Sequence, residues 1–250
     1  MLEVFAPVLE VPGLIPMILA VLVGGIVMGF AGFGSGLIFF PVAAAFVSPH
    51  MVVTSFALTT IGSIFTVLPN AWRDCEKRRT ITMVLPAFAG LLAGIFVLRY
   101  GDPVFLRWLI TLLVLVTLVA MVLGWRRTVG ETPRALASIG GAAGVVGGAS
   151  GLFGPVVILF NLSGTAPARV TRANILTFLV IVSSSTIPIL YLQGLYSVES
   201  FGLGLLFVPV YMIGTLFGQA LFVPKYERHY RIVGYLIVAG AVLVGLPIWG

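Results

Sequence analysis

The chain has 250 residues, of which 60% are hydrophobic and only 9% are charged, and its mean hydropathy is +1.16. Because this number of charges is too small to cover the surface of a soluble domain, the composition excludes a soluble protein. The net charge is +6, but the basic residues are scattered over short loops, which indicates membrane topology rather than binding to nucleic acid. Apolar stretches of about 20 residues, long enough to cross a bilayer, recur along nearly the whole chain. We therefore predict an all-α polytopic membrane protein.

The predicted membrane segments begin shortly after the N-terminus. The first residues carry Glu3 and Glu10 but no Lys or Arg, so the basic region of a secretory signal is missing. Eight apolar blocks follow, at residues 14–47, 51–69, 82–98, 105–123, 135–164, 173–192, 201–222 and 231–248. Six of them have the length of an ordinary transmembrane helix, but the first and the fifth are longer. As one straight helix, block 14–47 would be about 51 Å long, well beyond a hydrocarbon core of roughly 30 Å.

The basic residues orient these blocks, because short cytoplasmic loops retain Lys and Arg. Of the 14 basic residues, all but Arg99 and Arg107 lie in four loops, at 70–80, 124–134, 165–172 and 223–231. With these loops in the cytoplasm, block 14–47 begins and ends outside, and block 135–164 begins and ends inside. Both long blocks are therefore predicted to be re-entrant or broken-helix hairpins of two half-helices. Both chain termini are predicted to lie outside.

The sequence also contains an internal repeat. The stretch "GSGLIFFPV" at 34–42 is similar to "ASGLFGPVV" at 149–157, and "LPAFAGLLAG" at 85–94 is similar to "VPVYMIGTLFG" at 208–218. We predict a first repeat at 1–128 and a second at 129–250, each with one hairpin and three spans. Because each repeat has an odd number of crossings, the second is expected to be inverted relative to the first. Inverted repeats with interrupted helices are typical of transporters whose site lies near the membrane midplane.

Each predicted repeat also carries a Gly-xxx-Gly pair in its third element. The pairs are Gly90 with Gly94 and Gly214 with Gly218. Small residues let helices approach closely in lipid, so we interpret these pairs as packing contacts rather than substrate contacts. The same pairs are compatible with a homodimer.

The hairpin tips are the first candidates for a substrate-binding site. They comprise Gly34, Ser35 and Gly36 in the first repeat and Gly148, Ser150 and Gly151 in the second. A half-helix that begins at such a tip directs unpaired backbone N–H groups, and the positive end of its dipole, toward the membrane midplane. Such tips attract an anion without a buried Lys or Arg. The alternative is that the glycines only permit tight turns and packing, but packing would not require a serine at both tips.

Polar side chains on the span after each hairpin could add hydrogen bonds to an anion. The first span carries Thr59, Thr60 and Ser63, and the second carries Asn174, Thr177, Ser183, Ser184 and Ser185. Arg172, just before the second span, could reach inward and help to collect an anion. The alternatives are hydrogen bonds of these hydroxyls to their own helices and a solvated position for Arg172. No Asp, Glu, Lys or Arg lies at the centre of a predicted span, which argues against a relay of buried carboxylates.

An enzyme is the other class that the sequence raises, because "GASG" at 148–151 matches the Gly-x-Ser-Gly of intramembrane serine proteases. That chemistry requires a base within hydrogen-bond reach of the serine. The two histidines, His50 and His229, lie in predicted loops, and no lysine lies in a predicted span. We therefore predict a protein that is not an enzyme and that has no catalytic residue, metal or cofactor.

Four segments carry a family resemblance. They are "GGIVMGFAGFGSGLIFFP" at 24–41, its echo "GGAAGVVGGASGLFGP" at 140–155, "NAWR" at 70–73 and "PAFAGLLAG" at 86–94. Together they resemble the sulfite exporter TauE/SafE family, also called the 4-toluene sulfonate uptake permease family. One departure is that Pro155 comes one position earlier in its repeat than Pro41 does, so the two tips are not expected to be fully equivalent.

The resemblance implies a secondary carrier of the cytoplasmic membrane for a small sulfur-containing or organic anion, such as sulfite, sulfoacetate or another sulfonate. The family includes exporters and importers, and we expect export by alternating access between the two hairpin tips. An anion channel with the same tips, or an importer of a small organic anion, is an alternative, and a structural subunit without transport is another. Proton coupling and simple electrochemical exchange are both compatible with the sequence.

Overall fold

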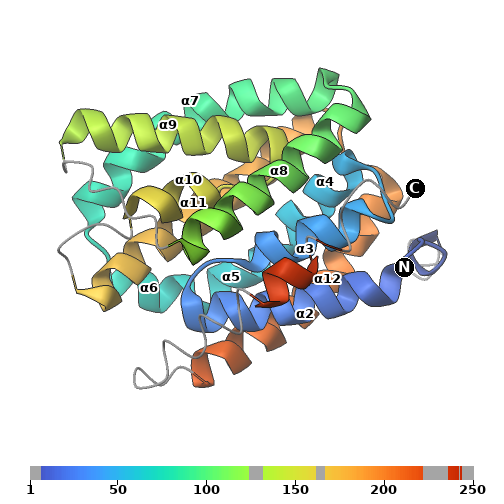
Figure 1. The fold of residues 1–250 in the computed structure, drawn as a ribbon, viewed down its shortest axis with the longest axis horizontal. Coiled ribbons are helices and arrows are strands. Elements are labelled where there is room, and N and C mark those ends of the chain that lie inside the picture. Colours follow the sequence, from blue (N-terminus) through green and yellow to red (C-terminus); the bar gives the residue numbers. More distant parts are fainter. Residues whose placement is uncertain (1–6, 124–131, 162–166, 222–235, 242, 244–250) are drawn as a thin grey trace.

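The computed structural model describes residues 7–123, 132–161, 167–221, 236–241 and 243. Every regular element in these ranges is a helix (Figure 1). The helices are α2 (Leu14–Ala31), α3 (Ser35–Ala44), α4 (Pro49–Thr59), α5 (Ile61–Thr66), α6 (Leu68–Asp74), α7 (Lys77–Tyr100), α8 (Pro103–Val122), α9 (Pro133–Ser150), α10 (Gly154–Asn161), α11 (Ala168–Leu192) and α12 (Val198–Ala220). The chain is therefore all-helical in its described part, as predicted.

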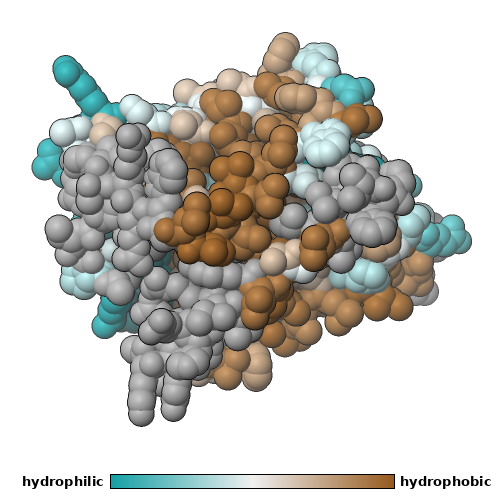
Figure 2. All heavy atoms as spheres, viewed as in Figure 1, coloured by the Kyte–Doolittle hydropathy of each residue, from teal (hydrophilic) through white to brown (hydrophobic). Residues whose placement is uncertain are grey.

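The helices include five that are long and apolar enough to cross a membrane: α2, α7, α8, α11 and α12. A sixth candidate span is made by α4 and α5 together with α6, and it is bent by 62°. The bend falls at Val67, directly before the N-terminal turn of α6 that holds Pro69, whose backbone lacks an N–H. Block 51–69, predicted as a span of ordinary length, lies within this bent pair of helices. The molecular surface is hydrophobic across its middle and hydrophilic toward two ends (Figure 2), as a multi-pass membrane protein requires.

Block 14–47 folds back on itself, but its two arms are unequal, unlike the two half-helices predicted. The first arm, α2, has 18 residues and is about 27 Å long, whereas α3 has only 10 residues. Ser35 at the start of α3 lies against Gly24, where an added Cβ would be 3.0 Å from the Ser35 carbonyl oxygen. Phe46, which follows α3, covers Gly13 at the start of α2. The short arm therefore begins at mid-depth of the long arm and runs back along it.

The fifth block has a similar long arm and short arm in its described part. The long arm is α9, with 18 residues, and the short arm is α10, with 8 residues. The end of this block at 162–164 lies outside the described residues, and so does most of block 231–248. The inverted relation of two repeats therefore stays a prediction.

Two close helix pairs form opposite edges of the molecule, α7 with α9 and α2 with α12 (Figure 1). Glycines set the short distance between these helices. A Cβ added at Gly90 would lie 2.2 Å from the Gly141 carbonyl oxygen, and one at Gly218 would lie 2.1 Å from that of Ile26. The packing interpretation of the Gly-xxx-Gly pairs is confirmed, and because these glycines face other helices of the same chain, they give no support to a homodimer.

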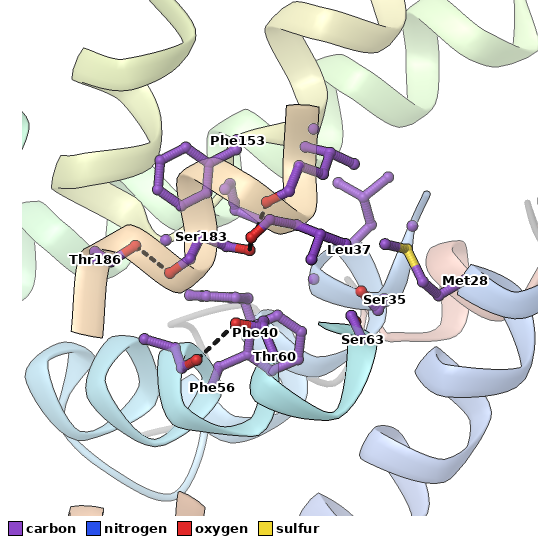
Figure 3. Close-up of a pocket in the computed structure, with 18 of the residues that line it drawn as sticks. Met28, Ser35, Leu37, Phe40, Phe56, Thr60, Ser63, Phe153, Ser183 and Thr186 are labelled. Carbon is purple, nitrogen blue, oxygen red and sulfur yellow. Dashed lines mark hydrogen bonds between the residues drawn. The ribbon is translucent and has the colours of Figure 1, made fainter. Parts of the chain in front are cut away.

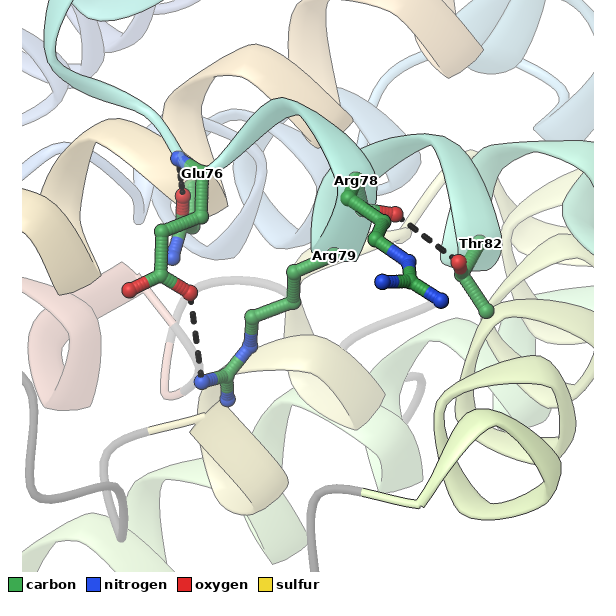
Figure 4. Close-up of polar contacts among 5 residues, drawn as sticks. Glu76, Arg78, Arg79 and Thr82 are labelled. Atoms are coloured by element: carbon green, nitrogen blue, oxygen red, sulfur yellow. Dashed lines mark hydrogen bonds and ion pairs between the residues drawn. The ribbon is translucent and has the colours of Figure 1, made fainter.

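Two of the predicted cytoplasmic loops, at 70–80 and 165–172, are largely helical in the residues that the structure describes. Residues 70–74 belong to α6, and Lys77, Arg78 and Arg79 form the first turn of α7, so the predicted loop at 70–80 is wrong. Positive charge is unfavourable at a helix N-terminus, and Glu76, directly before α7, offsets part of it (Figure 4). One of its carboxylate oxygens lies 4.0 Å from an Arg79 nitrogen, and its backbone N–H donates to the Asn174 side chain at 2.7 Å.

Contacts between distant segments gather the predicted outer loops at one end and the predicted cytoplasmic loops at the other. At the first end, His50 Nε2 lies 2.7 Å from the Leu98 carbonyl oxygen. At the second end, Arg169 donates two hydrogen bonds of 2.8 and 2.9 Å to the Asp74 carboxylate. The relative sides of these segments agree with the charge-based topology, while the absolute orientation in the membrane stays a prediction.

Candidate functional site

Glycine turns bring the two predicted tips together inside the molecule. Gly34 precedes α3 with a φ of +100°, and Gly151 follows α9 with a φ of +76°, a left-handed backbone that favours glycine. The tips also touch each other. A Cβ added at Gly36 would lie 3.1 Å from the Leu152 side chain, and one added at Gly151 would lie 2.2 Å from the ring of Phe40. Substitution at either glycine would therefore push the two tips apart.

A cavity of about 60 Å³ lies between the two tips (Figure 3). It is several times larger than the roughly 10–15 Å³ that one water requires, so it can hold a small ion. Its wall combines the tips with residues of α4, α5, α11 and α12, and aromatic rings form much of it. The hydroxyl groups in the wall belong to Ser35, Thr60, Ser63, Ser183, Thr186 and Tyr211. None of the described residues that line this cavity carries a charge at neutral pH.

The start of α3 supplies backbone donors to this cavity. Gly34 has no side chain that could cap the helix, and the backbone N–H groups of the first helical residues, Ser35, Gly36 and Leu37, have no carbonyl partner one turn earlier in the helix itself. All three residues line the cavity. These N–H groups and the positive end of the α3 dipole therefore favour an anion at this place.

Three of the six hydroxyls in the cavity wall, those of Thr60, Ser183 and Thr186, already have a partner in their own helix. Thr60 donates to the Ala57 carbonyl oxygen at 2.7 Å, and Thr186 donates to that of Ser183 at 2.6 Å. Such bonds are common for Ser and Thr in membrane helices, and this alternative therefore holds for part of the predicted polar stripe. A hydroxyl that donates its hydrogen to the helix can still accept a hydrogen bond. An anion needs donors, however, so such a hydroxyl does not help to bind it.

Ser35, Ser63 and Tyr211 differ from those hydroxyls. Tyr211 donates to Ser35 Oγ at 3.2 Å, so the hydrogen of the Ser35 hydroxyl stays available for a ligand. The Ser63 hydroxyl is buried, with 1% of the residue exposed, and has no hydrogen-bond partner among the described residues. A buried polar group without a partner costs about 1–3 kcal/mol. A bound oxyanion that accepts from Ser63 and Ser35 would remove that cost.

The structure brings five of the ten predicted site residues to the cavity and places the other five elsewhere. Those that line it are Gly34, Ser35, Gly36, Ser63 and Gly151. Thr59 is buried and donates to the Ser55 carbonyl oxygen at 2.8 Å, and Gly148 packs against α7 at Leu91 and Gly94. Ser150 donates to the Val146 carbonyl oxygen at 2.7 Å and accepts from the Leu152 N–H at 3.2 Å, so it holds the second tip in shape.

Asn174 and Arg172 are the other two predicted residues that do not line the cavity. The Asn174 amide oxygen accepts the Glu76 N–H and thereby fixes the junction between α6 and α7. Arg172 donates to the Gly29 carbonyl oxygen near the end of α2, and its side-chain carbons cover Gly32 in the first tip. Arg172 therefore supports the first hairpin from behind rather than facing the cavity.

Tyr211 is the main cavity residue that the sequence did not single out. It is 1% exposed and comes from α12, in the second predicted repeat, yet its hydroxyl reaches Ser35 in the first. A signal was present, because Tyr211 precedes Gly214 and Gly218 by three and seven residues. Those positions share one helix face, so the face that packs on α2 also carries the tyrosine.

Candidate membrane-spanning helices around a small buried cavity without charged residues are the architecture of a polytopic membrane protein. The chain belongs to the sulfite exporter TauE/SafE family, whose family model matches residues 17–244. This is a family of transporters and not of enzymes, so the "GASG" stretch at 148–151 is not a protease motif here. No curated protein and no solved structure matches the chain.

Proposed function

We propose that this protein is a secondary transporter that carries a small sulfur-containing or organic anion across the cytoplasmic membrane by alternating access, with export as its direction. The observation that carries the proposal is the cavity between the tips, where the N-terminus of α3 meets the buried Ser63 hydroxyl, which has no hydrogen-bond partner among the described residues. Family membership supports transport of this class of anion. The volume of about 60 Å³ favours a compact oxyanion such as sulfite over sulfoacetate or a bulkier sulfonate.

The charge of the anion would be stabilised without a buried cation. Helix N-termini at interrupted helices serve this purpose in transporters, because each presents several N–H groups and a partial positive charge. A site without Lys or Arg holds its anion weakly enough to release it on the far side. We assign the first N–H groups of α3, at Ser35 and Gly36, to the backbone part of the site and the hydroxyls of Ser35 and Ser63 to its side-chain donors. Gly34 and Gly151 shape the two tips through their left-handed backbone, and the Gly151 N–H itself donates to the Gly147 carbonyl oxygen.

Counterflow in proteoliposomes tests this proposal. Purified protein should exchange labelled sulfite for unlabelled sulfite across the membrane, and the exchange should saturate with concentration. The variant Ser35→Ala with Ser63→Ala should lose most of its affinity for sulfite, since two donors worth about 0.5–1.5 kcal/mol each are removed. Ser55→Ala is the matched control, because this buried serine of α4 donates to the Met51 carbonyl oxygen and does not line the cavity.

Measurements on the same vesicles distinguish a carrier from a channel and from a structural subunit. Unchanged sulfite exchange in the double variant would contradict the site, and currents that scale with voltage without counterflow would indicate a channel. Absence of both transport and binding for any small anion would indicate a structural subunit. Comparison with and without an imposed pH gradient separates proton coupling from electrochemical exchange.

A further inference from the structure

A groove of about 290 Å³ lies between the C-terminal halves of α7 and α11, and it shares no lining residue with the cavity between the tips. On α7 it is lined by one helix face that includes Leu92, Phe96, Arg99 and Tyr100. These residues are spaced as neighbours on one side of a helix, so they form a continuous stripe. Leu92 and Phe96 are 57% and 64% exposed, which places them against lipid rather than protein.

The other wall of the groove comes from α11 and, like α7, has an apolar residue along the groove and a polar residue at its end. Ile189 lies beside the apolar part of the α7 stripe, and Gln193 lies beside Arg99. Because Arg99 follows Leu92 by seven residues, the apolar part extends about 10 Å along the helix. The groove is therefore apolar along its length and polar only at the helix ends, where a membrane protein meets the headgroup layer.

The polar end of the groove is positive and keeps free donors. Arg99 donates to the Gln193 side-chain oxygen, and its guanidinium lies 5.4 Å from the centre of the Tyr100 ring. A guanidinium has five N–H donors in a fixed plane, so most of them stay available after this bond. No acidic residue is among those that line the groove in the described part of the chain. An anionic group is the complement of this end, and a hydrocarbon chain is the complement of the rest.

We propose that this groove binds an anionic phospholipid, with one acyl chain on the stripe of α7 and the phosphate on Arg99. Basic pockets between membrane helices recognise lipid headgroups by this combination, and a basic residue near the surface contributes about a fivefold preference for an anionic lipid. The lipid would fasten the outer ends of α7 and α11 to each other. This site does not depend on the transported anion.

Lipid retention by the purified protein in detergent tests the site. Native mass spectrometry with phosphatidylglycerol and phosphatidylcholine of the same acyl chains should show about fivefold stronger retention of phosphatidylglycerol. Arg99→Gln should lower that retention to the level of phosphatidylcholine. Arg107→Gln, which removes a half-buried basic residue at the start of the neighbouring α8, should leave the preference unchanged.

One further variant and a competition with inorganic phosphate complete the test. Ile189→Trp fills the apolar part of the groove and leaves Arg99 in place. This variant should retain less phosphatidylglycerol than the unaltered protein does. If it retains the same amount, no acyl chain lies in the groove. Inorganic phosphate should not displace the lipid, since displacement would indicate a site for free anions. Equal retention of the two lipids by the unaltered protein, or a preference that survives in Arg99→Gln, would overturn the proposal. Thermal unfolding without added lipid shows whether each variant is folded.

Discussion

At the scale of single residues, the proposed anion site relies on hydroxyl groups where many anion sites use charged side chains. Ser63 is buried without a partner among the described residues, and Tyr211 donates to Ser35 across the two predicted repeats. Each hydroxyl contributes little alone, so the arrangement of several around one small volume decides the affinity. Tyr211 also lies near Ser63, so one phenol borders both serine donors.

Tyr211→Phe should weaken anion binding while the protein stays folded. The ring keeps its packing against Phe56, but the hydroxyl that orients Ser35 is lost. One hydrogen bond is worth about 0.5–1.5 kcal/mol, so the Kd for sulfite should rise roughly two- to tenfold. Isothermal titration of the purified protein measures that change.

Tyr196→Phe is the control for the Tyr211 variant. Its hydroxyl is also buried and has no partner within the described ranges, and burial raises the pKa of this phenol, but Tyr196 lies in the connection before α12 and does not line the cavity. The Kd should stay the same in this variant. A similar loss of affinity in both variants would show that Tyr211 acts through stability and not through the site.

At the scale of helices, close packing of α7 on α9 offers a test with two adjacent glycines. A Cβ added at Gly140 would lie 2.0 Å from the Met83 carbonyl oxygen, whereas one added at Gly141 would come no closer than 3.8 Å to Pro86. Gly140→Ala should therefore force the helices apart and lower the free energy of unfolding by about 1–3 kcal/mol. Gly141→Ala should leave it unchanged or raise it by up to about 1 kcal/mol, because Ala favours a helix.

Thermal unfolding of the two glycine variants in the same detergent measures this difference. A lower Tm for Gly140→Ala than for Gly141→Ala is the expected order. The same Tm for both would mean that α7 and α9 are farther apart in the membrane than in the structure.

The helices also show which parts of the fold could be predicted from the sequence. Hydropathy located the spans α7, α8, α11 and α12, because the length of an apolar stretch is a local property of the sequence. The bend at Val67 and the helical residues 70–74 were missed, since apolar content alone does not separate a straight helix from a bent one. The repeated pattern singled out Ser35 and Gly151, which line the cavity. The position of Asn174 outside the cavity could not be predicted, because its partner, the Glu76 N–H, comes from a segment that is distant in the sequence.

At the scale of the whole molecule, the two predicted repeats interlock. The long arm α2 packs on α12, and the long arm α9 packs on α7, so each hairpin is held by a helix of the other predicted repeat. Neither repeat therefore encloses its own packed core. A movement that exposes the cavity to one side must carry each long arm together with its partner helix, because glycine contacts this close do not allow sliding.

The orientation of this assembly in the membrane yields the last prediction. Ser48 and Lys77 flank the bent span of α4 to α6, at opposite ends of it. The positive-inside rule places Ser48 outside and Lys77 in the cytoplasm. In a Cys75→Ala background, which removes the single cysteine, Ser48→Cys should react with an impermeant maleimide in intact cells. Lys77→Cys should react only after the cells are made permeable, and the reverse pattern would show that the molecule has the opposite orientation in the membrane.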